Sequence, residues 1–196
     1  MPWKLSVGDY YLSKLTEHQA QGDIYDSVKF VYATEIEEGW EASGIRKMAV
    51  SPMEGVWGGL LISHTCAFVA QPPGTSGYSH PFRLVAPVWP IGLLAEKLTD
   101  REIDNLREHD PYLGYMYLPA DGGIVMEESA ALLYRPALVT ESALSNESRH
   151  GRLTEGAMRV LQMKLTETFT GLRVKRDQFQ PDMSDSWNDY PQTGES

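Results

Sequence analysis

Cysteine is almost absent from this sequence: Cys66 is the one cysteine among 196 residues. A single cysteine excludes a disulfide within the chain and fits a reducing compartment without requiring one. The chain also lacks an apolar run near the roughly 18 residues that a membrane-spanning helix needs, and its first residues, MPWKLSVGDYYLSKL, are too polar for a secretory leader. We therefore expect a cytoplasmic protein with no membrane partner.

Basic residues are also scarce. The sequence has 17 lysines and arginines against 27 aspartates and glutamates, a formal net charge of −10 at pH 7. Because affinity for a phosphate backbone comes mainly from lysine and arginine, this composition disfavours RNA or DNA as a partner. The hydrophobic content of 42% and the length are sufficient for one domain with a full core.

Strand patterns are what the first half of the chain does contain. Runs rich in β-branched and aromatic residues predict strands at 24–36, 45–50, 58–69 and 82–88. Glycines and a proline in 37–55 indicate a hairpin or loop, and 71–81 is a predicted loop with two prolines and two glycines. A strand, turn, strand unit follows around Asp121-Gly122-Gly123.

Two helices are predicted in the second half of the chain. Thr99 and Glu102 have the spacing of a capping box at the start of 98–110. A second helix begins near Thr154 and ends at Gly171, a typical C-cap residue. Its apolar stripe, which indicates core packing or alternatively a dimer contact, is predicted to consist of Met158, Leu161, Leu165 and Phe169.

This order of elements predicts the α+β fold class. Several strands with one inserted helix and one final helix fit a small twisted antiparallel barrel or curled sheet, whereas a doubly wound parallel sheet needs helices between most strands. We expect an N-terminal extension over 1–21, a barrel domain over 22–172 and an acidic disordered tail over 173–196. The tail is either a solubilising end or a motif that docks on a basic partner.

The order of several short motifs resembles the MazF/PemK family, whose barrel is related to that of CcdB and Kid. The motifs are QGDIY, GGLLISHTCAFV, FRLVAPVWPI, YLPADGGIVMEES and RLTEGAMRVLQMKLTETF, and together they extend over about 22–171. The chain is also similar to uncharacterised actinobacterial and phage proteins with a strand of the type Leu-Ser-His-x-Cys. The resemblance implies an SH3-like barrel closed by an amphipathic helix, and commonly a dimer.

Members of that family typically cleave RNA, and the resemblance implies where the catalytic residues would stand. One is an arginine near the start of the second core strand, and the other is a threonine or serine at the end of the next strand. This sequence has Val56-Trp57-Gly58-Gly59 at the first place and Trp89-Pro90 at the second, so neither position is matched. The fold carries over more readily than the activity.

We therefore expect a MazF/PemK-like protein that acts by binding another protein in a toxin–antitoxin, phage or defence setting. The alternative is an enzyme. It would be either a divergent endoribonuclease that uses His64, His80 and Arg83, or a hydrolase that depends on Cys66. Neither hypothesis needs a cofactor.

His64 and Cys66 are the first candidate catalytic pair. On a strand they would share a face, and a thiolate beside an imidazolium gains nucleophilicity. Asp23, Glu127 or Glu128 would be the orienting third residue. The alternative is that Cys66 is a small buried hydrophobe and that His64 bonds to the backbone. A structural zinc site needs four ligands, which this stretch does not supply, so we expect no metal.

His80 and Arg83 flank the predicted loop 71–81 and form the second candidate site. Together they would bind a phosphate or a carboxylate, since binding residues often lie on loops held by rigid strands. The alternative is a solvated loop. Aromatic residues are a third candidate, as a base-stacking platform or as core and rim packing. They are Trp40, Trp57, Trp89, Tyr112, Tyr115 and Tyr117.

Overall fold

The computed structural model describes residues 5–15, 18–40, 46–64, 82–109, 114–140, 143–144 and 148–171, with the backbone alone for 31–40, 46–54 and 56. In chain order the elements are the 3-10 helix η1 (Val7–Asp9), β1 (Tyr11–Leu12), β2 (Asp23–Trp40), β3 (Arg46–Leu61), β4 (Phe82–Pro90), α1 (Ile91–Leu94), α2 (Asp100–Arg107), β5 (Tyr115–Leu118), β6 (Ser129–Leu132), β7 (Ala137–Thr140), β8 (Arg149–Leu153) and α3 (Glu155–Thr170). No helix in the described part of the chain is both long and apolar enough to cross a membrane.

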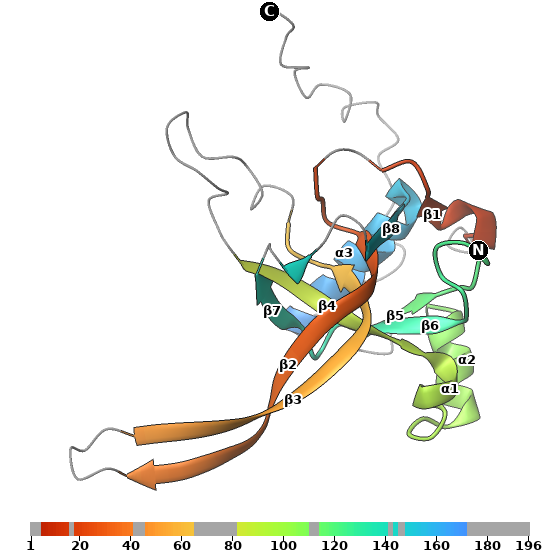
Figure 1. Ribbon diagram of the computed structural model, residues 1–196. Coiled ribbons are helices and arrows are strands. Elements are labelled where there is room, and N and C mark those ends of the chain that lie inside the picture. The colour runs from red at the N-terminus through yellow and green to blue at the C-terminus, as the bar shows by residue number, and fades with distance from the viewer. Residues whose placement is uncertain are drawn as a thin grey trace, which may run out of the picture.

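The strands form one antiparallel sheet of eight, which confirms the α+β class (Figure 1). The order is β1-β8-β2-β3-β4-β6-β5, and β7 pairs with β4 beside the β4–β6 pairing. Within the described residues no pairing joins β1 to β5, so the sheet is open where a closed barrel was expected. The segment expected as an N-terminal extension contributes β1, which pairs with β8.

The hairpin of β2 and β3 is much longer than the sequence predicted. It pairs from Ile24↔Leu60 to Trp40↔Arg46 and extends away from the rest of the sheet as an arm (Figure 1). The predicted short strand at 45–50 is therefore only part of β3, and of the two alternatives for 37–55, a hairpin or a loop, the structure has the hairpin. Pro52 and Gly55 are tolerated because, among the described residues, β4 pairs only with Gly58–Leu61 and the outer part of β3 pairs with β2 alone.

The predicted strand 58–69 is too long by at least residues 62–64, and 65–69 lie outside the described residues. β3 ends at Leu61, and the backbone N–H groups of Ile62 and Ser63 both donate to the carbonyl of Leu84. The Ser63 hydroxyl accepts from the N–H of Leu84 at 2.6 Å, so a side chain replaces the next backbone partner in the ladder. The chain leaves the sheet before His64.

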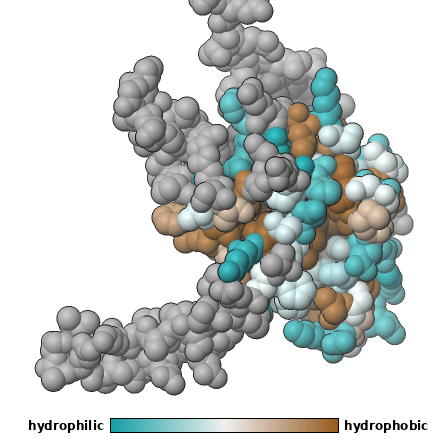
Figure 2. All heavy atoms as spheres, viewed as in Figure 1, coloured by the Kyte–Doolittle hydropathy of each residue, from teal (hydrophilic) through white to brown (hydrophobic). Residues whose placement is uncertain are grey.

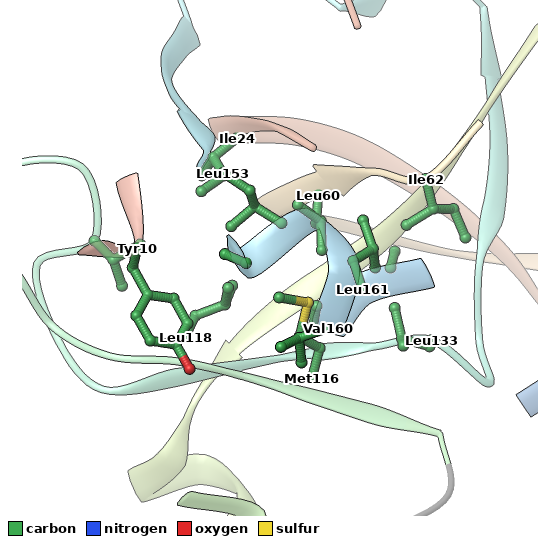
Figure 3. Close-up of a cluster of buried hydrophobic side chains, with 14 residues drawn as sticks. Tyr10, Ile24, Leu60, Ile62, Met116, Leu118, Leu133, Leu153, Val160 and Leu161 are labelled. Carbon is green, nitrogen blue, oxygen red and sulfur yellow. The ribbon is translucent and has the colours of Figure 1, made fainter. Parts of the chain in front are cut away.

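Helix α3 packs on one face of the sheet and forms the main core (Figure 3). Ala157, Val160 and Leu161 of α3 contact sheet residues such as Leu60 and Met116. Three residues of the predicted stripe, Met158, Leu161 and Leu165, pack in or against this core, whereas Phe169 is 58% exposed. Lys164 and Glu167 also lie on the buried face.

The opposite face of the sheet carries two further apolar clusters. The first, named here the β2–β7 cluster, contains Tyr25, Val28, Phe30, Leu61, Val85, Ala137, Val139 and Leu144. The second lies under the two short helices and contains Ile91, Leu94, Ile103, Leu106 and Ala130. The predicted capping box of α2 is confirmed, because Thr99 and Glu102 bond to each other's backbone N–H groups. The helix end at Gly171, in the left-handed conformation, is confirmed too.

Candidate functional site

The structure places two of the four predicted site residues. His64 is exposed and lies three residues beyond the end of β3. Arg83 is the second residue of β4 and is fully buried. Cys66 and His80 lie outside the described residues, so the His64–Cys66 pair and the His80–Arg83 pair stay predictions. His64, which was expected on a strand with Cys66, lies beyond the end of β3.

Arg83 does not face solvent as a residue that flanks a binding loop would. Residues alternate between the two faces of a strand, and Arg83 lies on the same face as Val85, in the β2–β7 cluster. One Nη1–H of Arg83 donates to the carbonyl of Phe82 at 3.2 Å. Because Arg83 has no exposed surface, its charge acts on the residues packed around it.

Asp23 lies on this same face and is also fully buried. Its carboxylate accepts from Arg152 Nε at 2.5 Å, from Arg149 Nη1 at 3.3 Å and from the Ala20 N–H at 2.7 Å. The pairing of β2 with β8 sets this geometry, since Asp23 lies opposite Arg152 and Tyr25 lies opposite Arg149. A register shift between these two pairs brings both arginines to one carboxylate.

A turn at Gly22 positions Asp23 at the start of β2. Gly22 has φ of +87°, and a Cβ there would lie 2.3 Å from the Met158 sulfur. Its N–H donates to the carbonyl of Leu61, and its carbonyl accepts from Leu153. Glycine is the residue that adopts this backbone without strain while α3 approaches so closely.

The Tyr25 side chain lies among these charges. It is fully buried, and its hydroxyl has no hydrogen-bond partner among the described residues. Burial raises the pKa of Tyr25 well above its usual value and the Asp23 carboxylate raises it further, while Arg149, Arg152 and Arg83 oppose that shift. Tyr25 is therefore a neutral phenol at physiological pH, and four charged groups influence its hydroxyl electrostatically. We name Asp23, Tyr25, Arg83, Arg149 and Arg152 the arginine cluster.

Sequence reasoning found only part of the arginine cluster. It proposed Asp23 as an orienting residue and Arg83 as a loop residue, and it missed Arg149, Arg152 and Tyr25. A signal was present, because two arginines stand in the short segment just before the N-cap Thr154. The register of β8 against β2 decides which carboxylate these arginines reach, and this register cannot be read from the segment alone.

A pair of tryptophans lies on the same face, between the two apolar clusters. Trp57 and Trp89 are half-buried, directly beyond the Gly58↔Val88 pair, and their ring centroids are 5.3 Å apart. Lys97 Nζ lies 5.1 Å from the centroid of Trp89. Neither indole N–H has a hydrogen-bond partner in the described part of the structure. These are the two positions at which the family resemblance implied catalytic residues.

Glu128, a candidate third residue, has its carboxylate bound by two donors. The Tyr117 hydroxyl donates to Oε1 at 2.6 Å and Arg107 Nη2 donates to Oε2 at 2.8 Å. These bonds, first that of Tyr117 and then that of Arg107, hold the pKa of Glu128 below its usual range. Glu128 is therefore an ionised, engaged acceptor rather than a poised base, and the adjacent Glu127 is exposed.

The described residues contain no group of three or more His, Cys, Asp or Glu side chains that is arranged to hold a metal ion. Comparison with models of known protein families and with curated protein sequences gave no match.

Proposed function

We propose that this protein acts by binding a partner protein in the cytoplasm, through a surface centred on the Trp57–Trp89 pair, and that it is MazF/PemK-like without the nuclease chemistry. The observation that supports this is the cross-strand contact of the two tryptophans at 5.3 Å. They occupy the two places where the family resemblance implies an arginine and a hydroxyl residue for RNA cleavage. An indole has no group that accepts or donates a proton in such a reaction.

The tryptophan pair has the properties of a binding centre. Tryptophan is enriched where a few residues carry most of the binding energy of an interface, because it buries a large rigid surface at low entropic cost. Both rings are only half-buried, and exposed Lys97 lies over Trp89. A partner in a toxin–antitoxin, phage or defence setting would cover this surface.

The proposal includes the finer fold type. In the β2–β7 cluster, Tyr25, Val28 and Phe30 of β2 pack with Ala137 and Val139 of β7. β2 and β7 are not hydrogen-bonded neighbours, so the sheet curls around this cluster. Such curling is what a barrel related to the SH3-like type requires. The same resemblance implies a homodimer, which the molar mass in solution would test.

One experiment tests the absence of ribonuclease activity. Purified full-length protein is incubated with single-stranded RNA in a metal-free buffer, and we expect the RNA to stay intact at high protein concentration. Fragments that disappear in the His64→Ala variant would contradict the proposal and favour the divergent endoribonuclease. Rapid alkylation of Cys66 at neutral pH, together with loss of a hydrolytic activity, would instead favour the hydrolase.

A second experiment tests the binding surface. Wild-type protein and the Lys97→Glu variant are used to capture partners from a lysate of the native host, with Lys14→Glu as the control. Both lysines are exposed, and the two variants change the net charge equally. We expect a specific protein that wild type and Lys14→Glu recover and Lys97→Glu recovers at least tenfold less. Equal recovery by both variants would place the interface elsewhere.

A further inference from the structure

We infer that the outer part of the β2–β3 hairpin is a dimerisation arm, one face of which packs against the same face of a second copy of this chain. The inference rests on the homodimer of the proposed function and names the surface that forms it. It is independent of the Trp57–Trp89 surface.

The first observation is that the outer hairpin is joined to the sheet at one end alone. β8 and β4 pair with the parts of β2 and β3 that lie nearest the body of the protein. From Phe30↔Gly55 to Trp40↔Arg46, the described residues show β2 paired with β3 only, and this part leads away from the other labelled elements (Figure 1). A two-stranded ribbon is marginally stable by itself in water, so we expect a ribbon of this length to pack on something.

The second observation is the residue pattern of the five outermost pairs. Residues directly opposite each other in an antiparallel ladder share a face, and successive pairs alternate between the two faces. Three pairs share the face that we name the arm face: Ile36↔Val50, Glu38↔Met48 and Trp40↔Arg46. The two pairs between them belong to the other face: Glu37↔Ala49 and Gly39↔Lys47. All the large apolar residues of this run are therefore on the arm face, and the ribbon is amphipathic.

The third observation is the charge of the arm face, which favours a second copy over a different partner. The face has one acid, Glu38, and one base, Arg46, and the two belong to different strands. Contacts across a two-fold axis occur in equivalent pairs, so a second copy brings the acid of each copy to the base of the other. A strongly acidic or strongly basic partner would instead meet one residue of its own sign.

The size of the arm sets the strength of the expected dimer. Ten residues of a strand extend about 33 Å and two paired strands are about 10 Å wide, so each copy contributes about 330 Å². A standard interface uses about 800 Å² from each partner. We therefore expect a weak dimer that dissociates on dilution, with a dissociation constant of about 10 µM or more.

The test measures the molar mass of the full-length protein by sedimentation between about 1 µM and about 300 µM, with a reducing agent that prevents a disulfide between copies through Cys66. Val50→Asp adds a charge to the arm face. Ala49→Asp adds the same charge to the other face at the neighbouring residue, and is the matched control. We expect Val50→Asp to weaken the dimer about tenfold or more and Ala49→Asp to weaken it about twofold or less.

Charge reversal separates a lost contact from a misfolded arm. Glu38→Arg and Arg46→Glu are each expected to weaken self-association about fivefold or more, because like charges then meet twice across the two-fold axis. An equimolar mixture of the two variants should dimerise about as strongly as wild type, since each copy then supplies the sign that the other lacks. A misfolded arm would not recover on mixing.

The outcomes distinguish this inference from the homodimer itself. A dimer that Val50→Asp and Ala49→Asp weaken equally, or that neither weakens, would overturn the arm as the interface and leave the homodimer standing. Charge-reversal variants that do not recover on mixing would do the same. A protein that stays monomeric at every concentration would overturn both.

Discussion

Asp23 forms two buried ion pairs at the start of β2. Its buried carboxylate joins β2 to β8 through Arg149 and Arg152 and also binds the N–H of Ala20 in the preceding turn. Removing one partner from a buried ion pair leaves the other charges in a medium of low dielectric without compensation. The cost is then larger than the pair's own contribution to stability.

The Asp23→Asn variant is therefore expected to lose about 3 kcal/mol or more of its free energy of unfolding, measured by urea denaturation. Asp26→Asn is the matched control. Asp26 also pairs with a basic residue, His150, but both side chains are exposed, and exposed pairs contribute about 1 kcal/mol or less. Equal losses in the two variants would show that burial does not decide the strength of the Asp23 interaction.

The lowered pKa of Glu128 makes the free energy of unfolding depend on pH in the acidic range. Its pKa in the folded protein is lowered from 4.5 by bonds from Tyr117 and Arg107. A group whose pKa is lowered by folding stabilises the protein fully above its unfolded pKa, and this contribution is lost as the pH falls through the folded pKa. The free energy of unfolding should therefore decrease as the pH drops below about 4.5.

The Tyr117→Phe variant keeps the ring but removes the hydrogen bond that lowers the pKa of Glu128 most. We expect a shallower loss of stability between about pH 5 and about pH 3 than in wild type. Urea denaturation at a series of pH values measures the slope. Glu127→Gln, at the exposed neighbour, should leave the slope close to that of wild type, and identical slopes in all three proteins would contradict the role of Tyr117.

At the scale of elements, α3 shows how contacts outside a helix decide which face is buried. The Thr154 hydroxyl donates to the Asp9 carbonyl and the Thr154 N–H donates to the Tyr10 carbonyl, so the N-terminus of α3 is attached to the segment before β1. These bonds hold the start of the helix against that segment. The buried face then contains Ala157, Lys164 and Glu167, which an apolar stripe read from the sequence does not include.

Substitutions on the two sides of α3 test which side of the helix is buried. Leu161→Ala is expected to lower the free energy of unfolding by about 2–5 kcal/mol because it leaves a cavity in the core. Phe169→Ala, at a residue that is 58% exposed, should change it by about 0.5 kcal/mol or less. Chemical denaturation measures both. A large loss for Phe169→Ala would favour the predicted stripe over the observed one.

The long β2–β3 hairpin contains a proline and a glycine within one of its strands. Gly55 and Pro52 were interpreted as signs of a hairpin or loop, and the structure has a hairpin in which both residues lie in β3. A proline lacks the N–H that would donate to a neighbouring strand, and within the described residues the outer part of β3 pairs with β2 alone. Local residue preference was overridden by the place of the strand in the sheet.

For the whole molecule, the central feature is that one sheet carries apolar clusters on both faces. Neighbouring residues of one strand serve opposite clusters: Leu60 packs toward α3 and Leu61 packs into the β2–β7 cluster, and Ile24 and Tyr25 do the same on β2. Figure 2 shows brown, hydrophobic residues between teal ones over the sheet on the face in view. Because the two clusters share strands, unfolding of these strands disrupts both clusters.

Unfolding is therefore expected to be a single cooperative transition. Tryptophan fluorescence, which includes Trp57 and Trp89 on one face, and circular dichroism, which includes α3 on the other, should give the same midpoint in urea. Two separate midpoints would mean that the faces unfold independently. A Leu61→Ala variant, altered on one face alone, should move both signals together.

The sequence by itself determined what depends on neighbours within a few positions. The capping box of Thr99 and Glu102, the helix start at Thr154 and the helix end at Gly171 involve bonds over three or four residues, so local pattern was sufficient to predict them. The α+β class followed from the order of such elements. The tertiary structure alone decided the arginine cluster, because Asp23 and Arg149 are 126 positions apart and meet only through the register of β2 and β8. That register depends on which face of the sheet is buried on each strand, and a slip of one residue would move both side chains to the opposite face.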